Sequence, residues 1–318
     1  MTLIKKTLAA AAVSLLALTA AHAEYPNDQP LRIVVPTDAG GSIDNLARIF
    51  QRTIEGMDVY PSVVVVNLPG AGGTVGTRAV KDAPADGYTI GLWSPGIITS
   101  KAMGVVDYDH NAFTVLGGTG LTEIGMGVLD SSPFADPTQL VEKAKGEPNS
   151  VVVATNIGLP VHFIPMMFAD EADVELKFVQ IGGGSKRLAS ILGEHTDTAL
   201  FSVSEFKRYE ESGLRPLFLF SEERDPDLPD TPTAKEAGVD VSISDFRVWL
   251  APEGVGDAET ARLQEVLQGV LADEKVKEEL AGLSIDPAWI PAEEVKTRLD
   301  DMDARTQPLV EAARSMAN

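Results

Sequence analysis

Two glycine-rich loops near the start of the chain constrain its fold more than any other feature. The first loop, PTDAGGSID at residues 36–44, follows the apolar run Leu31–Val35. The second loop, NLPGAGGTVG at residues 67–76, follows Val63–Val66. Short β-branched runs are typical of buried strands, and apolar residues at helical spacing follow each loop. The sequence therefore predicts two strand–loop–helix units within an α/β fold.

These two loops have the chemistry of an anion site. Glycine lacks a Cβ atom, so a ligand can approach bare backbone N–H groups, and a helix start adds unpaired donors and a positive dipole end. Helices that follow parallel strands begin at one crevice, where open α/β sheets bind ligands. We therefore predict a carboxylate site, with a tight turn that binds nothing as the alternative for either loop. The candidate residues in the loops are Thr37, Gly40, Gly41, Ala71, Gly72 and Gly73.

Other anionic partners fit the sequence less well. In the second loop, the spacing of Gly70, Gly72 and Gly76 is one position too long for a dinucleotide fingerprint, and neither loop ends in the Gly-Lys-Ser/Thr of a phosphate-binding loop. The net charge of −21, without a basic patch, argues against nucleic acid. Asp44 would repel a bound carboxylate, so we assign it to capping the helix and organising the N–H groups of the first loop.

Residues 1–23 have the pattern of a signal peptide. Lys5 and Lys6 precede the apolar run Leu8–Leu18, and Ala21-His22-Ala23 supplies small residues for cleavage after Ala23. The apolar run is too short to cross a membrane as a helix. The chain has no cysteine, which excludes a lipid-modified N-terminus, disulfides and thiolate metal sites. We therefore expect an exported, periplasmic, monomeric protein.

Strand-like runs alternate with helical patterns along the whole chain, without a linker rich in proline, glycine or serine. We expect two lobes joined by strands that cross near Val115–Leu129 and Phe246–Leu250, with the C-terminal helices returning to the first lobe. The first lobe would comprise residues 24–124 and 247–318, and the second residues 125–246. Besides the two runs above, the expected strands are Thr89–Trp93, Thr114–Leu116, Gly125–Leu129, Val151–Thr155, Leu176–Val179, Thr198–Phe201, Arg215–Phe220 and Phe246–Leu250. The expected helices are Ile43–Ile54, Pro137–Lys145, Val161–Ala169, Ser185–Leu192, Ser204–Ser212, Asp257–Ala281 and Ala292–Ala313.

Several separated motifs occur in the order found in a known family. They are PLRIVVP with Gly40-Gly41 and Asp44, NLPGAGG with Gly76, DGYT at residues 86–89, His162, Gly183-Gly184 with Leu192-Gly193, and LPDTPTAKEAG at residues 228–238. Through them the chain resembles the solute-binding subunits of tripartite tricarboxylate transporters, also called the Bug family. The resemblance covers nearly all residues after the signal peptide.

The resemblance implies a type II periplasmic-binding fold, in which two α/β lobes joined by crossing strands close on a ligand in the cleft between them. It implies that the glycine loops grip one carboxylate through backbone groups and ordered water, while the second lobe sets ligand specificity. The implied partners are a small organic carboxylate and the large and small membrane subunits of a transporter. It implies no cofactor.

Three departures from the family pattern leave the ligand open. Leu68 replaces a frequent arginine, Gln180-Ile181-Gly182 replaces Pro-Tyr-Lys, and Phe246-Arg247-Val248 replaces Trp-Tyr-Gly. The second change removes a lysine near the cleft, and the third adds an arginine near the crossing strand. Dicarboxylates of four to six carbons, citrate-like tricarboxylates, acidic amino acids and aromatic carboxylates all remain candidates.

Further candidates for ligand contact lie at strand ends and helix starts. Arg247 could take a distal carboxylate as a fork, or form a salt bridge with Asp245. Lys186 and Arg187 could face the cleft or be solvated surface charges. The remaining candidates are Ser94, Thr155, Asn156, His162, Gly183 and Ser202, for which helix capping, a buried hydrogen bond or a solvated hydroxyl are the alternatives.

Catalysis finds little support in the sequence. There is no Gly-x-Ser-x-Gly elbow and no His-Glu-x-x-His metal helix, and His110, His162 and His195 lack metal-ligand spacing. We predict an extracytoplasmic solute-binding protein that captures a small organic carboxylate, a di- or tricarboxylate or a related acid, for a tripartite transporter. A sensor module that presents the bound acid to a receptor kinase is one alternative, and a hydrolase on a similar fold is another.

Overall fold

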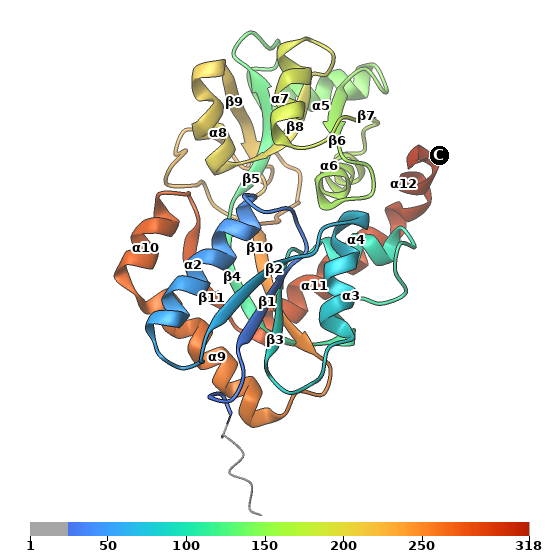
Figure 1. Ribbon diagram of the computed structural model, residues 1–318. Coiled ribbons are helices and arrows are strands. Elements are labelled where there is room, and N and C mark those ends of the chain that lie inside the picture. Colours follow the sequence, from blue (N-terminus) through green and yellow to red (C-terminus); the bar gives the residue numbers. More distant parts are fainter. Residues whose placement is uncertain (1–24, 318) are drawn as a thin grey trace, which may run out of the picture.

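The computed structural model describes residues 25–317 and shows two α/β lobes, one above the other in Figure 1. Each lobe has its own sheet and its own apolar core. Two extended segments of the chain run between the sheets. The predicted two-lobe α/β fold is therefore confirmed. The predicted signal peptide lies outside the described residues.

The sheet of the first lobe places both glycine loops at one edge. Its strand order is β11-β4-β10-β3-β1-β2, and β1, β2 and β3 are parallel. The loops after β1 and β2 therefore leave adjacent strands at the same end of the sheet. The strands are β1 (Leu31–Val35), β2 (Val63–Asn67), β3 (Thr89–Trp93), β4 (Phe113–Thr122), β10 (Asp245–Pro252) and β11 (Asp286–Ile290).

Helices cover both faces of this sheet (Figure 1). Each loop opens a helix, α2 after β1 and α3 after β2, so the helix starts stay close to the strand ends. Trp249 of β10 is fully buried against Phe50 of α2, with ring centroids 4.8 Å apart. The helices are α2 (Ser42–Gly56), α3 (Thr74–Lys81), α4 (Gly96–Ala102), α9 (Asp257–Ala272), α10 (Glu274–Ala281) and α11 (Ala292–Thr306).

The second lobe has a five-stranded sheet in the order β7-β6-β8-β5-β9. Its core is aromatic, with Phe168 stacked on Phe218 at 4.7 Å and Phe220 edge-on to both rings. Its strands are β5 (Ile124–Leu129), β6 (Val152–Thr155), β7 (Lys177–Gln180), β8 (Thr198–Ser202) and β9 (Leu214–Leu219). Its helices are α5 (Pro137–Gly146), α6 (Pro160–Glu171), α7 (Gly184–Leu192) and α8 (Val203–Tyr209).

Two crossings join the lobes. Glu123 alone separates β4 of the first sheet from β5 of the second, and residues 220–244 lead from β9 back to β10. The two crossings touch, because the Ser244 hydroxyl donates to the Glu123 carboxylate at 2.9 Å and 3.0 Å from its two oxygens. Relative motion of the lobes must bend both segments where they meet.

The C-terminal region differs from the prediction in three ways. The expected helix Asp257–Ala281 is two helices, because Asp273 leaves the helical conformation and caps α10. Strand β11 was not predicted, and neither, outside this region, was helix α4. The last helix, α12 (Val310–Ala317), does not return to the first lobe alone, because Leu309 and Ala313 pack in the core of the second lobe. No helix among residues 25–317 is both long enough and apolar enough for a membrane span.

Candidate ligand cleft

A cavity of about 880 Å³ lies between the lobes. The start of α2 lines it from the first lobe, and the starts of α6 and α8 line it from the second. Three helix N-termini therefore meet at one space, although a capping box already pairs N–H groups at the start of α8. Six of the predicted site residues line this cavity: Gly40, Gly41, Ser94, Asn156, Ser202 and Arg247.

The first glycine loop is held by its own carboxylate. Asp44 accepts hydrogen bonds from the Gly40 N–H at 2.7 Å, Arg48 Nε at 2.9 Å and Asn67 Nδ2 at 3.0 Å. Asn67 Nδ2 also donates to the Thr37 carbonyl at 3.1 Å. Burial alone would raise the pKa of Asp44, but these hydrogen bonds and the Arg48 charge hold it below its ordinary value.

These bonds leave the donors at the start of α2 available. Gly41 is the N-cap, and the N–H groups of Ser42 and Ile43 fall in the first turn, where the helix supplies no acceptor. Gly41, Ser42 and Ile43 all line the cavity. Because Asp44 is already bonded inside the loop, its charge is compensated there. Asp44 organises the loop by accepting from the Gly40 N–H, as predicted, but the prediction that it caps the helix is wrong, because Gly41 is the N-cap and no side chain bonds to the cap.

The second glycine loop approaches the cleft without lining the cavity. Gly70, Gly72 and Gly73 have positive φ angles, and a Cβ atom on Gly73 would overlap the Trp93 ring. A Cβ atom on Gly72 would lie 3.7 Å from Cδ2 of Leu159, a cavity residue of the second lobe. This loop therefore faces the opposite lobe beside the cavity. Thr37, Ala71, Gly72 and Gly73 are not among the cavity residues, and their ligand contacts stay predictions.

Thr155 and His162 hold the second lobe together behind the cleft. The Thr155 hydroxyl donates to the Val161 carbonyl at 2.7 Å, which ties the end of β6 to the start of α6. The His162 side chain is fully buried, and its Nδ1 accepts from the Gly158 N–H at 3.3 Å. Neither residue lines the cavity. For His162 the structure shows the buried hydrogen bond given as the alternative, whereas Thr155 does not cap the helix as its alternative had it, because the N-cap of α6 is Leu159. Gly183 caps α7 and also lies outside the cavity lining.

The burial of His162 predicts a pH dependence of stability. Burial lowers its pKa from 6.5 to about 4, so the folded state binds fewer protons than the unfolded state between these values. Its contribution to stability is present above pH 6.5 and is lost as the pH falls toward 4, about 3 kcal/mol in all. We expect His162→Asn, which keeps an acceptor for Gly158, to show a smaller fall in melting temperature between pH 7.5 and 4.5. The same substitution at the exposed His195 is the control, and an unchanged fall in His162→Asn would contradict the prediction.

Basic side chains line the cavity on the side of the second lobe. Arg187, Lys207 and Arg208 come from α7 and α8. Arg187 is 6% exposed, so its interpretation as a solvated surface charge is wrong, whereas Lys186 is exposed. Arg187 and the buried Ile191 are four positions apart, which places them on one helix face, and this spacing is the sequence signal for the burial of Arg187.

Arg247 lines the cavity and also forms the predicted salt bridge. Its Nη1 donates to Asp245 Oδ2 at 2.6 Å and to the Phe246 carbonyl at 3.1 Å. Its side chain is 16% exposed. Asn156 likewise lines the cavity, and its Oδ1 accepts from Gln180 Nε2 at 3.1 Å.

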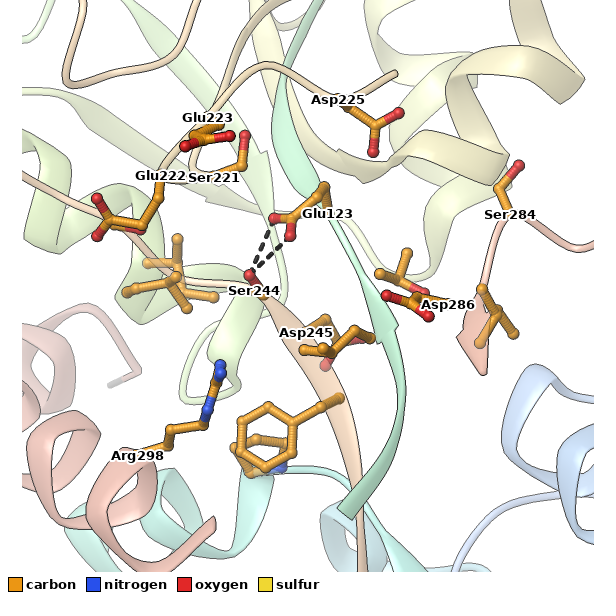
Figure 2. Close-up of a pocket in the computed structure, with 18 of the residues that line it drawn as sticks. Glu123, Ser221, Glu222, Glu223, Asp225, Ser244, Asp245, Ser284, Asp286 and Arg298 are labelled. Carbon is orange, nitrogen blue, oxygen red and sulfur yellow. Dashed lines mark hydrogen bonds between the residues drawn. The ribbon is translucent and has the colours of Figure 1, made fainter. Parts of the chain in front are cut away.

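A second cavity of about 850 Å³ adjoins the first at the crossing segments. Figure 2 shows Glu123 pointing toward Ser244, with further acidic side chains around them. Three arginines line this second cavity, and each pairs with an acid: Arg224 with Glu236, Arg298 with Glu294, and Arg305 with Asp301. Its remaining acids disfavour a bound anion, which leaves the first cavity as the candidate carboxylate cleft. No group of three or more histidines, aspartates or glutamates among residues 25–317 is arranged to hold a metal ion.

Glu123 in this second cavity predicts a stabilising substitution. Burial raises the pKa of Glu123, an effect that its hydrogen bond with Ser244 reduces in part. The contribution of Glu123 to stability is fully present below its ordinary pKa of 4.5. It is lost as the pH rises through the higher pKa that Glu123 has in the folded protein. We expect Glu123→Gln, which keeps an acceptor for Ser244, to raise the melting temperature at pH 7.5 and to lose this gain below pH 4.5. Glu223→Gln, at an exposed site, is the control, and a lower melting temperature of Glu123→Gln at pH 7.5 would contradict the prediction.

Two α/β lobes, crossing strands and a cavity where helix starts meet define a two-lobe solute-binding protein. The profile of the tripartite tricarboxylate transporter family receptor, TctC, matches residues 47–314, and the chain belongs to this family. The family consists of solute-binding receptors rather than enzymes, in agreement with the prediction from the sequence.

Individual relatives agree with this assignment. The chain is 30% identical over 300 residues to the UPF0065 protein in the tcbD-tcbE intergenic region of Pseudomonas sp. (strain P51), covering 91% of this chain and 88% of that protein. A TctC solute-binding protein from Polaromonas, solved without a ligand, has a TM-score of 0.79 at 23% identity and covers 91% of this chain and 100% of its own. An R. palustris protein solved with adipate has a TM-score of 0.75 at 23% identity, covering 91% and 98%. The two structures show the likeness of fold.

Proposed function

We propose that this chain captures a small organic carboxylate, a di- or tricarboxylate or a related acid, outside the cytoplasm for a tripartite transporter. One observation carries the proposal: the start of α2 opens into the cavity between the lobes while the acid of its own loop, Asp44, is neutralised by Arg48. An anion in the cavity then meets free N–H groups rather than a competing charge. The family of receptors and the adipate held by the R. palustris neighbour support the same ligand chemistry.

Binding would proceed by closure of the two lobes over the ligand. The start of α2 would hold one carboxylate, and movement at the crossing segments would bring the second lobe onto the rest of the ligand. Micromolar affinity requires about −8 kcal/mol. A few charge-assisted hydrogen bonds of about 1.5–3 kcal/mol each, with some apolar burial, would supply this after the cost of closure.

The protein would deliver its ligand to the large and small membrane subunits of the transporter, from a periplasmic location after signal cleavage. Presentation of the bound acid to a receptor kinase would use the same closure and is the second candidate. Deletion of the gene separates the two roles. Loss of uptake of the bound acid would support transport, and unchanged uptake with a lost transcriptional response would support sensing.

A thermal-shift screen of residues 24–318 against small carboxylates tests the proposal. A ligand that binds the folded state at a hundredfold excess over its dissociation constant adds about 2.7 kcal/mol of stability. We expect a shift from at least one acid, and no shift from its methyl ester or amide. A shift from neutral or cationic solutes alone would contradict carboxylate capture.

A further inference from the structure

Arg187 carries a buried charge that forms no ion pair with an acid of residues 25–317. It lies in the first turn of α7 on the second-lobe side of the cavity, and it is 6% exposed. An arginine stays protonated under ordinary conditions and has five N–H donors. One of them is used: Nη1 donates to the Gly182 carbonyl at 3.1 Å. Nε is buried without an acceptor, and Nη2 donates to no group among residues 25–317.

The nearest acid has another task. Glu205 Oε2 accepts from the Ser202 N–H at 3.0 Å and from its hydroxyl at 3.2 Å, which completes the capping box of α8. Glu205 exerts some attraction on Arg187, and it forms no ion pair with it within 4.0 Å. A buried guanidinium without a bonded counter-ion is costly, so an anion from outside would relieve that cost.

The guanidinium is also held in position. It lies over the Phe201 ring, 5.5 Å from the ring centroid, and its bond to Gly182 fixes one edge. Nη2 is the donor left accessible for a carboxylate oxygen in the cavity, because Nη1 is bonded to Gly182 and Nε is buried.

The other basic residues of the cavity are already engaged or exposed. Arg247 is bonded to Asp245 at 2.6 Å, and Lys207 is paired with Asp227. Arg208 is exposed and lies over the ring of Tyr209. Within the described part of the cavity wall, Arg187 is therefore the buried cation that lacks an acidic partner.

We propose that Arg187 forms a second anion subsite, which binds the distal carboxylate of a dicarboxylate whose first carboxylate lies at the start of α2. This inference rests on the proposed function and extends it, because it makes the preferred ligand a diacid and names the residue that selects it. Arg187 belongs to the second lobe and Gly41 to the first, so a diacid bound at both would bridge the lobes and stabilise the closed form. A monoacid would leave Arg187 without its anion.

Calorimetric titration with paired ligands tests this subsite. Succinate, glutarate and adipate would each be compared with the corresponding monoamide, which keeps the length and one carboxylate. We expect the wild-type protein to bind its best diacid at least about tenfold more tightly than the monoamide. In Arg187→Gln we expect the diacid to lose about 10- to 100-fold in affinity and the monoamide to lose less than about threefold.

The neighbouring Lys186→Gln is the matched control, because it removes the same charge from an exposed position one residue away. It should leave both affinities unchanged. Arg187→Lys should fall between the wild type and Arg187→Gln, because it keeps the charge and loses the Nη2 donor. An equal loss for diacid and monoamide in Arg187→Gln, or no loss for either, would overturn the subsite.

The ligand-free melting temperature separates the subsite from a structural role. If Arg187 serves to balance Glu205, Arg187→Gln lowers the melting temperature and leaves the preference for diacids intact, which would overturn the proposal. We expect the melting temperature to stay level or rise, because a buried charge without an ion pair is removed. Wild-type binding of acids without preference for diacids would overturn the subsite alone, whereas failure of every acid to bind would overturn the proposed function as well.

Discussion

Replacing Gly41 with valine should abolish carboxylate binding and leave the fold intact. Gly41 is the N-cap of α2 with φ −77° and ψ 170°, an extended conformation open to any residue. A Cβ atom there would meet only the Asp38 carbonyl at 3.5 Å and the Thr37 hydroxyl at 4.0 Å, which are ordinary contacts. The added methyl groups would occupy the space in front of the N–H groups of Ser42 and Ile43. We expect at least a hundredfold loss of affinity, about 2.7 kcal/mol, by calorimetry with an unchanged melting temperature.

The control for this substitution lies at the other end of the same helix. Gly56 is exposed and does not line the cavity, and a Cβ atom added there would meet no other atom within 4 Å. Gly56→Val should bind as the wild type does. Gly72 is a poorer test site than Gly41, because its φ of 67° strains any side chain and a loss of binding there could reflect loop distortion. Wild-type affinity in Gly41→Val would rule out a carboxylate at the start of α2.

Asp44→Ala should reduce both stability and binding. The Asp44 carboxylate is 1% exposed and accepts from Gly40, Arg48 and Asn67, so its loss leaves a guanidinium, an amide and a backbone N–H without their acceptor. Breaking a buried pair by removing one partner costs about 3–5 kcal/mol, although the exposed Arg48 side chain places this pair toward the low end. We expect a loss of about 3 kcal/mol in denaturant unfolding, with at least tenfold weaker ligand binding because the loop loses its shape.

Asp38 offers a matched control within the same loop. It is exposed, and its carboxylate accepts no hydrogen bond from residues 25–317. Asp38→Ala removes the same charge from the same segment and should change stability by less than about 0.5 kcal/mol. If Asp44→Ala were as stable as Asp38→Ala, the hydrogen-bond network would not be what organises the loop.

The strands that carry the glycine loops could be predicted closely from the sequence. Leu31–Val35 has the predicted bounds and Val63–Asn67 ends one residue after the predicted Val66, because apolar β-branched runs bounded by proline or serine define a strand locally. The two-lobe arrangement follows from separated family motifs rather than from periodicity. Long-range pairing of β10 with β4 leaves no pattern in either strand alone.

Other elements depend on contacts that no local pattern contains. Strand β4 extends to Thr122. The predicted strand ended at Leu116 because Gly117 and Gly118 interrupt the apolar run. Gly117 is required there, since a Cβ atom would overlap the Trp289 ring of β11. Strand β11 itself escapes prediction because Pro287 stands within it at the edge of the sheet.

In the candidate site, too, local features could be predicted from the sequence and features that depend on long-range packing could not. The first glycine loop and the role of Asp44 in it could be predicted because glycine positions and a helix start are local features. The sequence favours a surface position for Arg187 because charged residues usually lie there, a preference that outweighs its helical spacing from Ile191. The packing of α7 on Phe201 shows that Arg187 is buried. The sequence places His162 correctly in α6, but its depth behind the cavity depends on Phe163 and Phe178, which surround its ring.

The central claim is that backbone N–H groups at the start of α2 hold a ligand carboxylate. A crystal structure of residues 24–318 with the tightest-binding acid from the thermal-shift screen tests this claim most directly. The account predicts a carboxylate oxygen within hydrogen-bond distance of the N–H groups of Ser42 or Ile43, with the ligand enclosed between the lobes. A carboxylate bound elsewhere, with the start of α2 facing only water, would contradict it.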